Sequence, residues 1–315
     1  MTMKHITERR KMASAGLAAA MSGLLLLGGC ASVLDSSRMV DEPLLPAAPE
    51  RTLDEPSELA LARAEAMLGA KQFEAAYGKF ASVLRDQPDN FKARLGAAEA
   101  SLGLGKLGEA LAGFESAMEA VEYRPAALQG RGITLSLIGQ RELGQTLLLQ
   151  AVAEDPSLWR AWNAIGRNHD MADNPDFALE AYDRALRANS RAGAIHNNRG
   201  LALLALRRYA EAESAFRKAL LIEPESGTAQ MNLRLTVAWQ GRYNEALVGL
   251  KPGHLPLALN NVGFVAMQKG DLDVAKSCFV KAMEASPSYY ARAARNLEYL
   301  EEIRSTTVLS AEAQG

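Results

Sequence analysis

A glycine-rich stretch in the first third of the chain has the spacing of a nucleotide-binding loop. Gly103, Gly105 and Gly108 form the pattern G-x-G-x-x-G. In dinucleotide-binding proteins this pattern follows a strand and opens a helix, and an acidic residue about 20 positions further on contacts the ribose. A nucleotide site therefore requires a strand directly before Gly103, and the surrounding sequence must be examined for one.

The acidic residues Asp170, Asp173 and Asp176 have a spacing that resembles a calcium-binding loop. Pro175 lies among them, however, and the glycine and terminal glutamate of an EF-hand loop are missing. No set of His, Cys and Asp residues has the spacing of metal ligands, and neither G-x-S-x-G nor H-E-x-x-H occurs. The sequence predicts no catalytic residue, no metal site and no cofactor, and therefore a protein that is not an enzyme.

Cys30 is the residue best placed for covalent modification. Residues 1–29 begin with basic side chains, continue with an uncharged run and end in small residues, as a secretory signal peptide does. The ending Leu-Gly-Gly-Cys at 27–30 resembles the lipobox of bacterial lipoproteins. The resemblance implies cleavage before Cys30, a diacylglycerol on its thiol and acylation of the freed amine. The alternative is an ordinary signal peptide that happens to contain a cysteine.

The position after Cys30 bears on the membrane. In lipoproteins of enteric-type bacteria an Asp there tends to retain the protein at the inner membrane, and this chain has Ala31. The resemblance therefore implies a lipid anchor in the outer membrane, on its periplasmic face. Residues 30–56 contain several prolines among Ser, Asp and Glu, and we expect a flexible tether of roughly 25–30 Å.

The rest of the composition favours helices and argues against nucleic acid as a partner. Ala and Leu are abundant, aromatic residues are 6% of the chain, and the formal net charge of −2 comes without a basic block. No feature of the sequence indicates a small-molecule substrate.

From residue 57 onward the sequence repeats with a period of 34 residues, as Pro88, Pro156 and Pro224 illustrate. We align the units from residue 57 and call each position within the aligned unit a column, so that residue 57 is in column 1. Column 8 often holds Gly, column 20 holds Ala or Gly, and column 15 often holds a turn Gly. Column 24 carries a large apolar residue: Phe80, Phe114, Leu148, Tyr182, Phe216, Leu250 and, in a last unit starting at 256, Phe279. Each unit therefore predicts two amphipathic helices that approach closely at small residues.

These columns resemble those of the tetratricopeptide repeat family. The resemblance is clearest in the unit with Trp162, Gly166 and Tyr182. It implies an all-α superhelix, or α-solenoid, of about seven helix-turn-helix units over residues 57–289. We expect a capping helix over 290–304 and a frayed tail over 305–315. Within this frame the glycine pattern follows a helix and lies in a turn, which excludes the nucleotide site.

The sixth unit is shorter than the others, with only 29 residues. Residues 251–256 read Lys-Pro-Gly-His-Leu-Pro and cut its second helix short. Two interpretations remain, an irregular packing joint or a hinge before the seventh unit. We favour the packing joint.

A surface for partners is predicted on the first helices of the later units. In this family first helices line a concave face that binds an extended or helical peptide. Column 6 holds Asn198, Asn232 and Asn261, whose amides can both donate to and accept from a peptide backbone. The alternative is that Asn is simply common at this column. The predicted partner-binding groove consists of Asn197, Asn198, Met231, Asn232, Leu235, Asn260, Asn261, Phe264 and Met267.

The C-terminal stretches 260–271, 281–290 and 294–297 are similar to the TadD lipoproteins of tight-adherence (Flp) pilus systems. This resemblance implies an outer-membrane lipoprotein that binds protein partners and supports assembly of the pilus secretion system, with pilotin-like help to the secretin. One alternative is a general periplasmic repeat scaffold, such as a type IV pilus pilotin or an adaptor for cell-wall enzymes. Another is a subunit whose activity resides in an enzyme partner.

Overall fold

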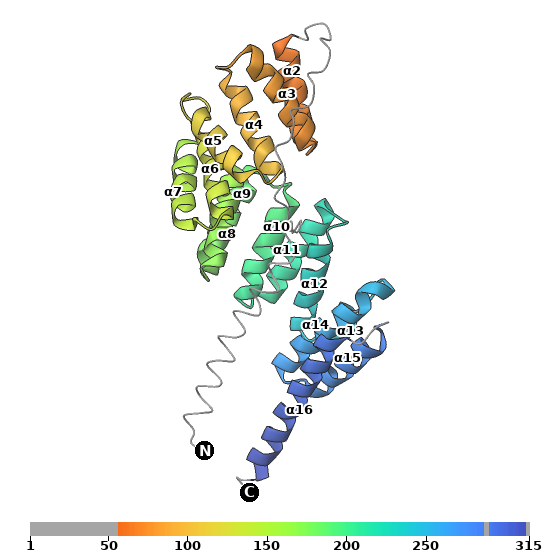
Figure 1. The fold of residues 1–315 in the computed structure, drawn as a ribbon. Coiled ribbons are helices and arrows are strands. Elements are labelled where there is room, and N and C mark those ends of the chain that lie inside the picture. Colours follow the sequence, from red (N-terminus) through yellow and green to blue (C-terminus); the bar gives the residue numbers. More distant parts are fainter. Residues whose placement is uncertain (1–55, 287–289, 313–315) are drawn as a thin grey trace.

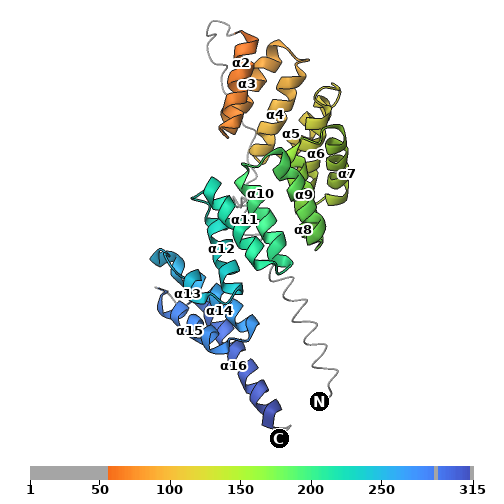
Figure 2. The ribbon, with the colours of Figure 1, turned by 180° about the vertical axis from the view of Figure 1, so that it is seen from behind.

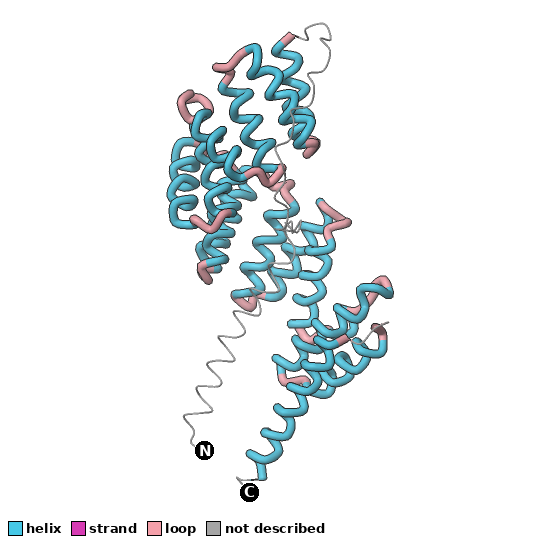
Figure 3. The backbone as a smooth tube through the Cα atoms, in the orientation of Figure 1, coloured by secondary structure: helices cyan, strands magenta, loops and turns pink. Residues whose placement is uncertain are grey.

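The computed structural model describes residues 56–286 and 290–312, and every regular element in these ranges is helical. The helices form an elongated, curved stack that runs from α2 at one end to α16 at the other (Figure 1). The reverse view shows the same single file of helix pairs (Figure 2), and the backbone tube shows short connections between them (Figure 3). The predicted all-α tetratricopeptide-type superhelix is confirmed. The signal peptide, Cys30 and the tether up to residue 55 lie outside the described residues.

Each of seven units contributes a first and a second helix. The first helices are α2 (Ser57–Gly69), α4 (Phe91–Gly103), α6 (Arg124–Leu137), α8 (Trp159–Met171), α10 (Gly193–Ala205), α12 (Gly227–Trp239) and α14 (Leu255–Lys269). The second helices are α3 (Phe73–Asp86), α5 (Leu107–Ala117), α7 (Arg141–Glu154), α9 (Pro175–Ala188), α11 (Tyr209–Ile222), α13 (Tyr243–Ala246) and α15 (Leu272–Glu284). A single helix, α16 (Ala291–Glu312), follows them.

The turn between the two helices of a unit requires a left-handed residue at column 15. Gly105, Gly139, Gly241 and Gly270 have φ between 74° and 91° there, as the glycine pattern predicts. In the other three units the same column holds Lys71, Asp173 and Arg207 with φ of 57–60°. The turn geometry is therefore common to all seven units, although three of them adopt it with a residue that carries a Cβ atom.

Small residues at column 8 make room for the large residue at column 24 of the same unit. A Cβ atom on Gly166, Gly200 or Gly263 would lie 2.5–2.8 Å from the ring of Tyr182, Phe216 or Phe279, respectively. These rings are fully buried. The two columns are therefore complementary, and each unit carries its own part of a continuous core.

The first helices form the inner layer of the curve. Each first helix contacts the first helix of the next unit, from α2 with α4 through to α12 with α14. Within the described part of the chain, no two successive second helices approach as closely. Because the helices on the inside of a curved stack must lie closer together, the first helices line the concave side.

The sixth unit departs from this arrangement, since α13 has 4 residues where the other second helices have 11–14. The side chain of Arg234 on α12 donates to the carbonyl oxygens of Ala246 (2.9 Å) and Val248 (2.7 Å), where α13 ends. The next first helix, α14, packs directly on α12. Val237, Ala246, Val262 and other buried residues from both sides share one core cluster. These contacts favour the packing joint over the hinge.

The last helix, α16, packs on α14 and α15 and then projects from the stack (Figure 1). Leu300 is fully buried in a cluster with Met267 and Phe279. The helix continues to Glu312, past the predicted end at residue 304, because residues 305–312 contain no Gly or Pro to stop it. None of the helices in the described ranges combines the length and the apolar character needed to cross a bilayer.

Candidate partner-binding face

The nine residues of the predicted groove lie on three consecutive first helices. Asn197 and Asn198 are on α10, three of the others are on α12 and four are on α14. Because α10 contacts α12 and α12 contacts α14, the fold brings all nine to one side of the stack. We call this surface, formed by α10, α12 and α14, the inner face.

The nine side chains differ in their access to a partner. Met231 is 38% exposed. Asn197, Asn198, Leu235 and Phe264 are half-buried. The buried members are Asn232, Asn260, Asn261 and Met267, with exposed fractions of 3–8%. Met267 belongs to the core cluster beneath α16, so it supports the inner face from below.

Asparagine side chains join successive units on this face. Asn198 Nδ2 donates to Asn163 Oδ1 (3.0 Å), and Asn232 Nδ2 donates to Asn197 Oδ1 (2.9 Å). In both pairs the donor occupies column 6 of one unit and the acceptor column 5 of the unit before it. Two of the three column-6 amides therefore hold units together, and direct binding of a peptide by them remains a prediction.

The same pairing extends beyond the residues that sequence reasoning selected. Asn296 on α16 donates from Nδ2 to Asn260 Oδ1 (2.9 Å), so α16 docks as the first helix of an eighth unit would. At the other end of the series, Gln129 at column 5 of the third unit accepts through Oε1 from the backbone N–H of Ala161 in the fourth unit (3.0 Å). The sequence does carry a signal for these acceptors, because column 5 holds a side-chain amide in four units: Gln129, Asn163, Asn197 and Asn260.

The pairing is interrupted between α12 and α14. In the regular pairs the acceptor amide is at column 5, but column 5 of the sixth unit is Met231. By analogy with the Asn232–Asn197 pair, Asn261 therefore faces a thioether in place of an amide oxygen. Asn261 Oδ1 accepts from Asn260 Nδ2 at 3.4 Å. Its own Nδ2 has no hydrogen-bond acceptor among the described residues, although the side chain is only 7% exposed. A buried amide donor without an acceptor costs about 1–3 kcal/mol.

Other residues with potential chemistry have structural surroundings. Gly103 ends α4 and Gly105 lies in the turn before α5, so a helix precedes the glycine pattern. Cys278 is buried in the core around α14, and burial raises the pKa of its thiol. His169 stacks on Phe177, with ring centroids 5.5 Å apart. In the described part of the chain, no group of three or more His, Cys, Asp and Glu side chains could hold a metal ion.

Family comparison identifies the repeat. Two family models of the tetratricopeptide repeat match residues 164–229 and 257–289. These two stretches are tetratricopeptide repeats. Together with the geometry of the stack, this assigns the helix pairs to a fold that typically serves as a non-catalytic scaffold and binds protein or peptide partners.

Solved structures show the same fold at low sequence identity. The structure of the APC/C hetero-tetramer Cut9-Hcn1 has a TM-score of 0.59 and 15% identity, covering 77% of this chain. The chain spans about half of the matched Cut9-Hcn1 chain, 49% of its length. The C-terminal part of a tetratricopeptide-repeat protein from Cytophaga hutchinsonii has a TM-score of 0.52 and 16% identity, with coverage of 75% of this chain and 99% of that one. The search of curated proteins gave no match.

Proposed function

We propose that this chain is an outer-membrane lipoprotein that binds a protein partner on its inner face and supports assembly of a Flp pilus secretion system. In this proposal a lipid on Cys30 holds the repeat stack at the periplasmic side of the membrane. The inner face binds the secretin and helps to place it, without turnover. Support for the pilus system comes from the resemblance of residues 260–297 to the TadD lipoproteins.

The observation that carries partner binding is the interrupted asparagine pairing at Asn261. A peptide carbonyl over Met231 would give the Asn261 amide the acceptor that the preceding unit does not supply. Exposed Met231 and the half-buried Leu235 and Phe264 offer apolar contact around that hydrogen bond. A Met side chain adapts to irregular partners because it is unbranched and polarisable. The inner face at α12 and α14 therefore combines a hydrogen-bond donor with an adaptable apolar rim.

A single substitution tests the donor without disturbing the contacts between units. Asn261→Leu removes the amide at similar volume and should weaken binding of purified secretin about two- to tenfold. Its melting temperature should fall less than that of the control below, because the hydrogen bond it loses, from Asn260 Nδ2, is long at 3.4 Å. The matched control is Asn232→Leu at the same column. Because Asn232 donates to Asn197, that variant should lower the melting temperature. Unchanged secretin binding by Asn261→Leu would remove Asn261 from the proposed site.

The anchor and the partner are tested separately. Cys30→Ser should abolish incorporation of a fatty-acid probe and release the protein from membranes. A photo-crosslinking amino acid at Met231 should capture the secretin in cells, whereas one at the exposed Val121 should not. Capture of a type IV pilus component or a cell-wall enzyme at Met231 would replace the Flp assignment with the general scaffold. A soluble, unlabelled wild-type protein would refute the lipoprotein assignment.

A further inference from the structure

Column 9 of the first helices changes character along the stack. In the first four units this column is mostly charged: Glu65, Glu99, Ile133 and Arg167. From the fifth unit on it holds large apolar residues, which are Leu201, Leu235 and Phe264. All three side chains are half-buried, so a partner on the inner face can reach them. The apolar part of this column therefore begins where the inner face begins.

Helix α16 continues the column past the last complete unit. Asn296 donates to Asn260 in the register that joins successive first helices, so Asn296 takes column 6 of an incomplete eighth unit. In the same numbering Tyr299 takes column 9, and this residue is 49% exposed. Four successive first helices therefore carry a large side chain at one column. We call these four residues, Leu201, Leu235, Phe264 and Tyr299, the apolar stripe.

In the first half of the stack, the acidic residues at column 9 are paired with cations at column 2. Lys92, at column 2 of the second unit, lies 2.6 Å from Glu65, at column 9 of the first (Nζ to Oε1). Arg160, at column 2 of the fourth unit, pairs with Glu99 of the second (Nη1 to Oε1, 3.2 Å). Both of these column-2 cations therefore have a carboxylate at column 9 of a preceding unit.

The last cation at column 2 lacks this carboxylate. Arg292 of α16 is at column 2, and by analogy with the Lys92–Glu65 pair it faces Phe264 in place of an acid. Arg295 follows one turn later, and like charges at this spacing destabilise a helix that offers them no counter-ion. Both arginines are exposed, and neither makes an ion pair or a hydrogen bond among the described residues.

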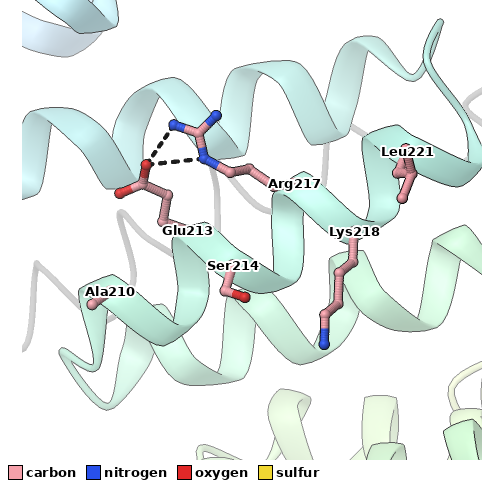
Figure 4. A pocket seen from close by; sticks show the side chains of 6 residues that line it. All are labelled: Ala210, Glu213, Ser214, Arg217, Lys218 and Leu221. Carbon is pink, nitrogen blue, oxygen red and sulfur yellow. Dashed lines mark hydrogen bonds and ion pairs between the residues drawn. The ribbon is translucent and has the colours of Figure 1, made fainter.

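An arginine on a second helix shows what Arg292 lacks. Figure 4 shows a shallow pocket on α11 that is lined by Ala210, Glu213, Ser214, Arg217, Lys218 and Leu221. In it Arg217 folds back on Glu213 of the same helix, at 2.6 Å between Nη2 and Oε1 (Figure 4). No Asp or Glu lies within four residues of Arg292 in either direction along the sequence. The carboxylate that Arg292 lacks can therefore come from a bound partner.

The spacing of the apolar stripe selects the conformation of a bound segment. The axes of packed helices lie about 8–10 Å apart, so successive members of the stripe are separated by about that distance. Three residues of a polyproline II segment span about 9 Å and return the side chain to the same face. A β-strand returns to that face after about 7 Å, and an α-helix after about 5.4 Å. The polyproline II repeat therefore matches the stripe best.

We propose that the inner face binds an extended, polyproline II segment of its protein partner, with a large apolar side chain at every third position and acidic residues at the end that lies over α16. The apolar side chains contact the apolar stripe, and the acidic residues pair with Arg292 and Arg295. The Asn261 amide donates to a backbone carbonyl of the same segment. This inference rests on the proposed function, because it specifies which kind of segment the inner face binds.

Three synthetic peptides test the proposal through their binding to the full chain, measured by fluorescence anisotropy. The first peptide has four leucines at every third position, proline and serine between them, and two glutamates at each end, so that both chain directions are covered. In the second peptide, of the same composition, the leucines are at every second position. In the third, lysines replace the glutamates. The first peptide should bind at least about tenfold more tightly than either of the others.

Two substitutions locate the bound peptide on the stack. Arg292→Glu should weaken binding of the first peptide about tenfold and reverse the preference between glutamate and lysine peptides. Tyr299→Ser should weaken binding of the first peptide about threefold or more, because it removes one member of the apolar stripe. The control, Arg187→Glu, replaces an exposed arginine on α9 and should leave binding unchanged. All three residues are exposed, so the melting temperatures should not change.

The outcomes separate this proposal from the proposed function and from other occupants. Equal binding of the three peptides, or wild-type affinity in Arg292→Glu, overturns the proposal. The measurement of secretin binding by Asn261→Leu then still decides the proposed function. The proposal is also overturned if deletion of residues 31–55 raises the affinity for the first peptide about tenfold, since that segment then occupies the stripe. A dimer that Arg292→Glu dissociates overturns it in favour of a second copy.

Discussion

The fifth and sixth units share the same columns but complete their cores in different ways. In the fifth unit α11 has 14 residues, and Phe216 at column 24 is fully buried under Gly200. In the sixth unit α13 has 4 residues, and the corresponding Leu250 lies in a loop and is half-buried. A regular unit is therefore stabilised by its own helix pair, whereas the sixth depends on Arg234 and on α14.

This difference shows how a repeat array tolerates a shortened unit. Helix ends leave backbone carbonyls without intrahelical partners, and an early end inside the stack would leave them buried. Arg234 binds the carbonyl oxygen of Ala246 at the end of α13 and that of Val248 in the following turn. Direct packing of α14 on α12 buries apolar side chains of both helices in one core cluster.

The largest expected difference between the two units concerns column 24. Phe216→Ala should lower the free energy of unfolding by about 3–5 kcal/mol, because the ring is fully buried and leaves a cavity. Leu250→Ala should cost less than about 1.5 kcal/mol, since the side chain is only half-buried. Urea denaturation followed by circular dichroism measures both. Equal losses would show that the sixth unit is packed as tightly as the fifth and would break the comparison.

Arg234 should matter more than a surface arginine of a regular unit. Arg234→Met removes two charge-assisted hydrogen bonds to the end of α13 and should cost about 2–3 kcal/mol. The loss should appear as faster hydrogen exchange in α13 and α14. The control is Arg217→Met on α11. Arg217 is 57% exposed, and Glu213 keeps its hydrogen bonds from Gln240 and Arg242, so the loss should be at most about 1 kcal/mol. If α13 and α14 exchange as in the wild type, Arg234 does not stabilise the joint.

The smallest expected effects come from the turn column, where the two units differ in residue type but share a left-handed backbone. Arg207→Gly in the fifth unit should stabilise the protein by about 1 kcal/mol, because glycine removes the strain of a Cβ atom at φ 58°. Gly241→Ala in the sixth unit should destabilise it by a similar amount. Melting curves of the two variants check the opposite signs. Two changes of the same sign would mean that the backbone at this column rearranges.

Much of the fold was predictable because its determinants are local or strictly periodic. The ends of the first helices follow from the turn residues at column 15. The sequence also shows that a small residue at column 8 recurs with a large one at column 24, and these two pack together in the structure. The capping helix was predicted to stop at residue 304, but no residue between 305 and 312 ends a helix. The nine residues predicted for the groove lie on first helices, and their role in binding a partner stays a prediction. Their hydrogen-bond partners were not foreseen.

The sequence by itself determined the number of units, their helical pairs and the position of the shortened one, since these depend on residue type at fixed spacing. Only the tertiary structure decided which amides are used between units, that Asn261 Nδ2 has no acceptor among the described residues, and that Arg234 binds the end of α13. These contacts join residues of different helices, up to 36 positions apart for the asparagine pairs. Their distances depend on how successive helices rotate in the superhelix, because a small rotation brings a side chain into or out of hydrogen-bond range.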